Sequence, residues 1–174
     1  FAGNITFGGA VGAVALTSIL INDANNVTAA AINAGSFTQV ASTTGTGTTS
    51  LGSVTLTGLF AFTGTNLTMN GVGTNAIGNT MTVTNAGLFT TYNGGLAPTG
   101  ADLVVGSDFV QNGDGLNSIG GNITSTSDGI SFASGVTLTN NVTMTSGLLG
   151  GDDISFATAI RSDVSTTRDL TLTA

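Results

Sequence analysis

The sequence has 174 residues, of which only 6% are charged; two arginines and nine aspartates give a formal net charge of −7, and Lys, Glu, His and Cys are absent. This composition excludes disulfide bonds, and it excludes a basic nucleic-acid-binding surface because phosphate binding depends on clustered Lys and Arg. It also removes the usual general bases, thiol nucleophiles, Schiff-base lysines and soft metal ligands, so we expect no enzyme activity.

The first long apolar segment, residues 10–21, is interrupted by Gly12, Thr17 and Ser18. A membrane-spanning helix needs about 20 apolar residues, so the sequence predicts no membrane span. Across the whole chain, 40% of the residues are hydrophobic and the mean hydropathy is +0.40. That apolar content favours a folded core over a disordered linker, although Gly, Thr, Asn and Ser are abundant.

Five short segments further along the chain share one alternating pattern of aliphatic residues and threonines. Such alternation directs the two kinds of side chain to opposite faces of a β-strand, and Thr suits a pleated surface. Clusters of Asn, Asp and Gly between the segments, such as residues 112–115 and 120–122, predict turns. The five predicted strands are residues 54–57, 81–84, 136–139, 142–145 and 170–173.

One self-similar pattern has the form Ile-Ser-Phe or Ile-Thr-Phe. It begins at Ile130, returns one repeat later at Ile154, and also occurs at Ile5. A repeat of about 24 residues is typical of a β-solenoid coil, whereas a propeller blade needs about 40 residues or more. We therefore expect Ile5, Ile130 and Ile154 to occupy equivalent positions in their coils.

A second pattern is a Gly-x-Phe element at Phe37, Phe60 and Phe89, with a weaker copy at Phe109. Successive copies are separated by roughly 20–29 residues, which is again the length of a solenoid coil. The two patterns together predict an all-β fold, a right-handed parallel β-helix (solenoid) of roughly seven coils of about 20–29 residues. Phe and Ile at equivalent positions are expected to stack as ladders inside the coils.

The period also continues across the two ends of the chain. In a copy joined after Ala174, the next Ile5 would follow Ile154 at nearly the interval that separates Ile154 from Ile130. We therefore expect residues 1–174 to be a single β-solenoid segment, one part of a longer tandem array or head-to-tail filament. Its predicted partners are neighbouring copies of the same chain, end to end, because open solenoid ends carry unpaired backbone groups.

The repeats Gly-x-Phe-Thr-Gln, Asn-Ile-Thr-Phe, Ile-Ser-Phe-Ala and Val-Thr-Leu-Thr resemble those of the filamentous-haemagglutinin-like adhesins and related giant β-strand-repeat surface proteins of bacteria. The resemblance covers essentially the whole chain. It implies a right-handed β-helix that is secreted to the cell surface and acts in adhesion, cohesion or filament formation. Host-cell or matrix glycans are the further partners that it implies.

The segment from residue 108 to 122 is the richest in oxygen ligands. Calcium takes several oxygens from Asp, Asn and backbone carbonyls, which makes Asp108, Asn112, Asp114 and Asn117 the candidate ligands. The pattern lacks the acidic twelfth ligand of an EF-hand and the tandem nonapeptides of calcium rolls. The alternative is a turn in which Asn and Asp bond their own backbone, and no cofactor other than calcium is expected.

Carboxylate pairs are the remaining catalytic alternative. Two Asp side chains can hydrolyse a glycoside, and the candidate pairs are Asp108 with Asp114, and Asp152 with Asp153. Neighbouring residues in a strand point to opposite sides, however, and in a turn they only add solubility.

The threonine pairs suggest a second class of function. Flat threonine ladders on a solenoid can order water, which would make the chain a binding module for ice or a surface glycan. The pairs are irregularly spaced, however, with a full coil length between Val54 and Met81 but only a short turn between Val136 and Val142. Five Asn-x-Thr sequons are glycan acceptors in a glycosylating host, at Asn4, Asn26, Asn66, Asn122 and Asn141.

Overall fold

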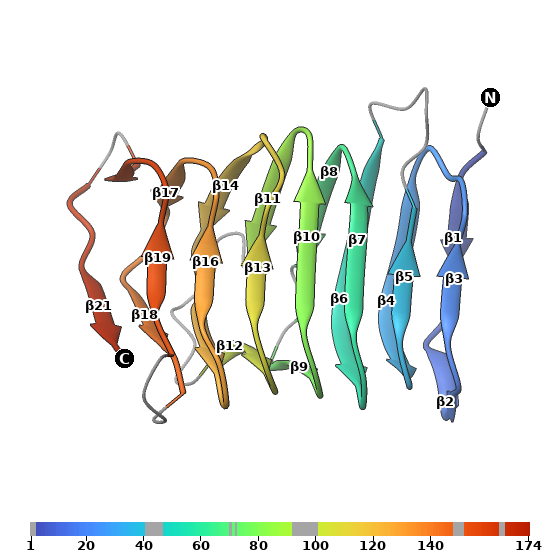
Figure 1. The fold of residues 1–174 in the computed structure, drawn as a ribbon. Helices are drawn as coiled ribbons and strands as arrows, with labels where there is room; N and C mark the ends of the chain where they lie inside the picture. The colour runs from blue at the N-terminus through green and yellow to red at the C-terminus, as the bar shows by residue number, and fades with distance from the viewer. Residues whose placement is uncertain are drawn as a thin grey trace.

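The computed structural model describes residues 3–40, 47–69, 71, 73–91, 101–147, 152–163 and 166–174. Within these ranges the chain consists of β-strands and turns without a helix, and so without a helix able to span a membrane. Coils follow one another along a single axis from the N-terminal to the C-terminal end (Figure 1). The predicted all-β parallel β-solenoid is confirmed, whereas its right-handedness stays a prediction.

Each coil passes three faces. Face 1 and face 2 are the two parts of a 14-stranded parallel sheet, and face 3 is a separate seven-stranded parallel sheet, seen in the foreground of Figure 1. Two long strands, β4 (Val27–Ala34) and β6 (Thr48–Leu56), run through faces 1 and 2 and join them. At the bend in β6, a Cβ on Gly52 would lie 1.9 Å from the carbonyl oxygen of Ala30, so only glycine fits there.

The other strands are shorter and belong to one face each. Those of face 1 are β1 (Ile5–Phe7), β8 (Asn66–Met69), β11 (Leu88–Thr91), β14 (Leu116–Ile119), β17 (Val136–Leu138) and β20 (Ile160–Ser162). Those of face 2 are β2 (Val11–Leu16), β9 (Asn75–Ile77), β12 (Ala101–Val105), β15 (Asn122–Ser125), β18 (Val142–Thr145) and β21 (Leu170–Thr173). Those of face 3 are β3 (Ile19–Ile21), β5 (Phe37–Gln39), β7 (Phe60–Gly64), β10 (Met81–Asn85), β13 (Phe109–Gln111), β16 (Ile130–Phe132) and β19 (Ile154–Phe156).

Register is kept from coil to coil although the coils differ in length. On face 3, residues paired between neighbouring coils are 18 to 28 positions apart in the sequence. These lengths are close to the predicted range. The predicted equivalence of Ile130 and Ile154 is confirmed, because the two residues are paired between β16 and β19.

Alternation fills the interior with apolar side chains and leaves threonines outside. The predicted strand at 54–57 overlaps the end of β6, and those at 81–84, 136–139 and 142–145 begin where β10, β17 and β18 begin. The aliphatic residues of all four are at most 3% exposed. The fifth, at 170–173, is β21, where Leu172 points inward in register with Met144 but remains 48% exposed. No coil of the described chain lies beyond it.

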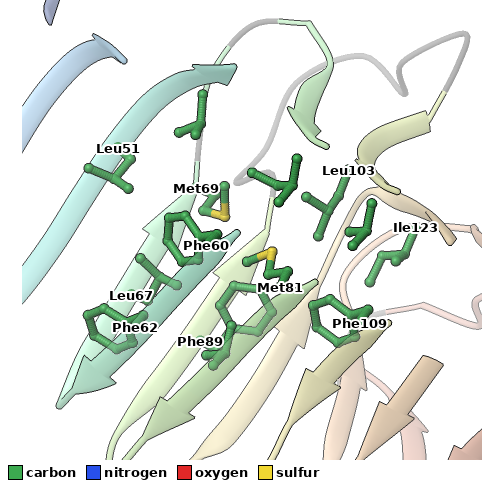
Figure 2. Packing of buried hydrophobic residues seen from close by; sticks show 14 of the residues in the cluster. Leu51, Phe60, Phe62, Leu67, Met69, Met81, Phe89, Leu103, Phe109 and Ile123 are labelled. Carbon is green, nitrogen blue, oxygen red and sulfur yellow. The ribbon is translucent and has the colours of Figure 1, made fainter. Parts of the chain in front are cut away.

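Phenylalanine rings stack along the axis inside the coils, and Figure 2 shows the part of this core around Phe60, Met81 and Phe109. Ring centroids are 5.0 Å apart between Phe37 and Phe60. They are 5.1 Å apart between Phe109 and Phe132, which in turn stacks on Phe156 at 5.5 Å. Aromatic pairs at these separations add to the free energy gained from burying their area, so the predicted internal ladder is confirmed for these rings.

The predicted equivalence of Ile5 with the other two isoleucines is wrong. Ile5 lies in β1 on face 1 and pairs with Val27, whereas Ile130 and Ile154 lie on face 3. Strands with the apolar-polar-apolar tripeptide occur on all three faces, so a matching tripeptide does not identify the face.

The predicted row of phenylalanines is also wrong at Phe89. This residue lies on face 1 and pairs with Leu67, and Met81 is the residue that continues face 3 after Phe60. Phe89 nevertheless meets the ladder from the opposite side of the interior, with its ring centroid 6.1 Å from that of Phe109.

Candidate functional site

The outside of face 1 carries a continuous row of hydroxyl groups, one from each of seven successive coils. These residues are directly paired between neighbouring strands, which lie about 4.8 Å apart. At the C-terminal end of the row, the Nε of Arg161 donates to the Oγ1 of Thr137 at 3.1 Å. We call these residues the hydroxyl row: Thr6, Thr28, Ser50, Thr68, Thr90, Ser118 and Thr137.

The Thr-x-Thr pairs of the sequence do not form this surface. They are divided among the faces: Thr55 lies on face 2, Thr82 on face 3 and Thr137 on face 1. The hydroxyl row takes one residue per coil from otherwise dissimilar strands. Only the register between coils identifies its members.

The Asn-x-Thr sequons have a structural role at the corners between faces. In each, the Asn lies at a corner, the middle residue is apolar and points inward, and the Thr points outward. The Asn Oδ1 bridges to the next coil: in four sequons it accepts a backbone N–H bond, and in the first it accepts from a second Asn. These bonds are Asn26 to Thr48 N at 2.9 Å, Asn66 to Leu88 N at 2.8 Å, Asn122 to Thr143 N at 2.7 Å, Asn141 to Asp169 N at 3.0 Å, and Asn4 to Asn26 Nδ2 at 2.9 Å.

A groove lies at the corner between face 3 and face 1, where β7, β10 and β13 end. It has a volume of about 270 Å³ and crosses three coils. Each coil contributes three consecutive residues: one to the wall on the face-3 side, one to the floor and one to the opposite wall. We call this the corner groove, and its residues are Thr63, Gly64 and Thr65, then Thr84, Asn85 and Ala86, then Asn112, Gly113 and Asp114.

A buried polar network supports the floor of the corner groove. Gln111 is 1% exposed, and its Nε2 donates to the Oδ1 of Asn85 and to the carbonyl oxygen of Gly113, both at 2.7 Å. Its Oε1 accepts from the Nδ2 of Asn117 at 3.3 Å and from the Oγ of Ser134 at 3.1 Å. The side chain therefore links three coils from the inside.

The four predicted calcium ligands are not brought together. Asp108 precedes β13 and Asn112 follows it, so about 13 Å of extended backbone separates them. The Oδ1 of Asp108 accepts from the backbone N–H of Gly129, and Asn117 is 1% exposed with its Nδ2 donating to the Oγ of Ser134 at 3.0 Å. Only Asn112 and Asp114 share one site, the corner groove.

The two carboxylate pairs considered for glycoside hydrolysis are placed differently. Asp108 and Asp114 lie at opposite ends of β13. Asp152 and Asp153 precede β19, the first half-buried and the second exposed. Across the described ranges no group of three or more acidic residues has the arrangement needed to hold a metal ion.

Asp102 is the most deeply buried carboxylate among the described residues, at 7% exposure. Its Oδ2 accepts from the backbone N–H of Asn122 at 2.8 Å. Burial raises the pKa of Asp102 above its ordinary value, and the hydrogen bond from Asn122 offsets only part of this effect. The side chain bridges β12 and β15 on face 2, on the far side of the coil from the corner groove.

Comparison with protein-family models, curated proteins and solved structures finds no match to this chain.

Proposed function

We propose that this chain is a structural and adhesive segment of an extracellular fibre on a bacterial surface or in a matrix, acting in adhesion, cohesion or filament formation. The observation that carries the proposal is the stacking of parallel strands on three faces from the first described coil to the last. Backbone hydrogen bonds in such a stack run along the axis, and the internal apolar ladder resists shear between coils. The acidic, lysine-free composition and the resemblance of the repeats to bacterial surface adhesins support secretion to the cell surface.

The ends of the segment are suited to further stacking. The N-terminal end consists of β1, β2 and β3, and the C-terminal end of β19, β20 and β21, so each end offers one strand on every face. A second copy placed end to end would extend all three faces and cover the inward side of Leu172. We propose neighbouring copies of the same chain as its partners in this geometry.

Electron microscopy of the purified chain tests the fibre. We expect unbranched filaments with an axial step of roughly 35 Å per copy, given about 4.8 Å per coil. Leu172→Lys places a charge on the exposed end of the core and should abolish the filaments. Leu116→Lys is the matched control, because Leu116 is similarly exposed, at 51%, but lies on the side of a central coil. Dispersed monomers of the unmodified chain, or equal effects of the two substitutions, would refute end-to-end stacking.

The hydroxyl row supports a second candidate function, a binding module that orders water and binds ice. Its groups are regularly spaced along a parallel sheet, as a lattice-matched surface requires. Freezing-point hysteresis and ice recrystallisation assays test this candidate. Activity that disappears in Thr68→Lys but persists in Ala61→Lys, on face 3, would favour it over the fibre; no activity in the unmodified chain would eliminate it.

A further inference from the structure

We propose that the corner groove binds a sugar unit of an uncharged glycan. The inference rests on the adhesive part of the proposed function but does not depend on filament formation. It names the site and the chemical class of the ligand: a polyol without a formal charge, held by hydroxyl, amide and carboxylate groups along three coils.

The three turns that line the corner groove are longer than the two turns that follow them at the same corner. Phe62, Val83 and Gln111 are in register on face 3, and between each of them and the first inward residue of the face-1 strand that follows lie four, five and five residues, respectively. The same turn contains only three residues after Phe132 and after Phe156. The tight turns therefore lie on the C-terminal side of the groove.

The floor keeps the groove open and rigid. A Cβ at Gly113 would lie 2.2 Å from the carbonyl oxygen of Asn85, so this position accepts only glycine. Asn85 is 1% exposed, and its Nδ2 donates at 3.1 Å to the carbonyl oxygens of Gly87 and Leu116 while its Oδ1 accepts from Gln111. A floor held from within does not need to rearrange when a ligand binds, which reduces the entropic cost of binding.

The walls offer the polar groups that a sugar needs. Thr84 Oγ1 donates to Asn112 Oδ1 at 2.6 Å, which fixes the amide so that its Nδ2 points away from that bond. Asp114 is exposed, and within the described part of the chain its carboxylate accepts no hydrogen bond. A sugar hydroxyl both donates and accepts, so it can donate to Asp114 while accepting from Asn112 or Thr63.

Charge and size restrict the ligand further. The chain has only two basic residues, Arg161 and Arg168, and neither lines the groove, so a sulfated or acidic glycan would meet Asp114 without a compensating cation. The volume of about 270 Å³ is near the lower limit of ligand pockets, roughly 300 Å³, which suits one sugar ring with its neighbours projecting along the axis. Calcium is disfavoured because it takes 6–8 oxygen ligands and the groove offers one carboxylate.

Fluorescence anisotropy with end-labelled maltohexaose, cellohexaose and chitohexaose tests the inference. We expect saturable binding of at least one of these probes by the unmodified chain, unaffected by EDTA. Asp114→Ala should weaken it about tenfold, since it removes a charged hydrogen-bond acceptor. The control Asp153→Ala removes another exposed carboxylate, at a different corner, and should leave the affinity unchanged.

A second experiment uses a variant whose side chain blocks the corner groove. Ala86→Trp fills the middle of the corner groove and should abolish binding, whereas Ala133→Trp, on the tight turn of the next coil, should not. Absence of saturable binding by all three probes, or binding that survives Ala86→Trp, would overturn the inference. The labelled probes bind to monomers and filaments alike. Electron microscopy of the same samples therefore distinguishes a failure of glycan binding from a failure of filament assembly.

Discussion

Replacing Gln111 by Met tests whether the buried polar network holds the long corner turns in place. Gln111 is the inward residue at the end of β13, in register with Val83 and Phe132, which are both apolar. A methionine of similar length would therefore suit the core by shape and polarity. If the network contributes nothing, Gln111→Met should stabilise the protein.

We expect the opposite result. Met would leave the Oδ1 of Asn85 without its donor, and it would remove the 3.3 Å bond from the backbone N–H of Ser134. Each buried polar group left unsatisfied costs about 1–3 kcal/mol. The greater hydrophobicity of Met returns only about 1 kcal/mol. With two such groups, the free energy of unfolding should therefore fall by roughly 1–5 kcal/mol.

Gln39 provides a matched comparison at the equivalent position of an earlier coil. Its Oε1 accepts a single described hydrogen bond, from the Oγ1 of Thr49 at 2.9 Å. Gln39→Met should therefore cost about 0–2 kcal/mol, because only the buried hydroxyl of Thr49 loses its described partner and the gain in hydrophobic burial offsets about 1 kcal/mol. The two variants differ in the number of bonds lost rather than in the side chain introduced.

Urea unfolding followed by circular dichroism measures the difference between the two variants. Amide hydrogen exchange in β13 and β14 shows whether the loss of stability in Gln111→Met is confined to these coils. Coils of a solenoid interact mainly with their neighbours and can open locally. A Gln111→Met variant as stable as the unmodified chain, or a Gln39→Met variant equally destabilised, would refute the reasoning.

Three further predictions concern faces 1 and 2. Asp102→Asn should stabilise the chain at pH 7 but not below pH 3.8. Because the pKa of Asp102 is raised in the folded protein, its contribution to folding is fully present while the carboxyl is protonated in both the folded and the unfolded protein, and it is lost as the pH rises through the folded pKa. Urea unfolding of the variant and the unmodified chain at the two pH values should show this difference. Asn122→Ala should lower the free energy of unfolding by about 1 kcal/mol through loss of its bond to Thr143, and an unchanged urea midpoint would contradict the bridging role. Leu138→Pro should cost about 3 kcal/mol or more, because β17 lies between β14 and β20 and loses a ladder donor; a thermal midpoint equal to that of the unmodified chain would contradict this placement.

The fold class could be predicted because its signal is local and repeated. Alternation with period two directs Val136 and Leu138 inward regardless of what they meet, and the structure buries both. The interval between Ile130 and Ile154 equals one coil, because the two residues are paired between β16 and β19. Strand identity and coil length therefore follow from sequence wherever the turns are regular.

Assignment to faces could not be predicted, because a coil contains three strands of one pattern. The interval between Phe60 and Phe89 resembles a coil length, yet it comprises one coil plus the passage from face 3 to face 1. Distinguishing these cases requires the lengths of individual turns, which the composition of the turns does not reveal.

The corner groove illustrates the same limit. Asn112 and Asp114 are recognisable in sequence as oxygen ligands, but the same reasoning includes Asn117, which is an inward residue paired with Val136. An Asn in a turn and an Asn inside a coil look alike in sequence when the boundary of the strand is uncertain. The alternation of Asn117 with Ile119, two positions later and fully buried, is the indication that separates them.

Corner turns are where a solenoid of this kind can change without losing its register. The coil containing β10 and β11 and the one containing β13 and β14 differ in length from their neighbours, yet Met81 pairs with Phe109 and Phe109 with Ile130 across them. Each face re-establishes its pairing through the next inward apolar residue, so extra residues at a corner cost only loop entropy, which grows slowly with length. A binding surface can therefore be built at a corner while the faces retain their structural role, which is why we place adhesion at the corner groove and assembly at the two ends.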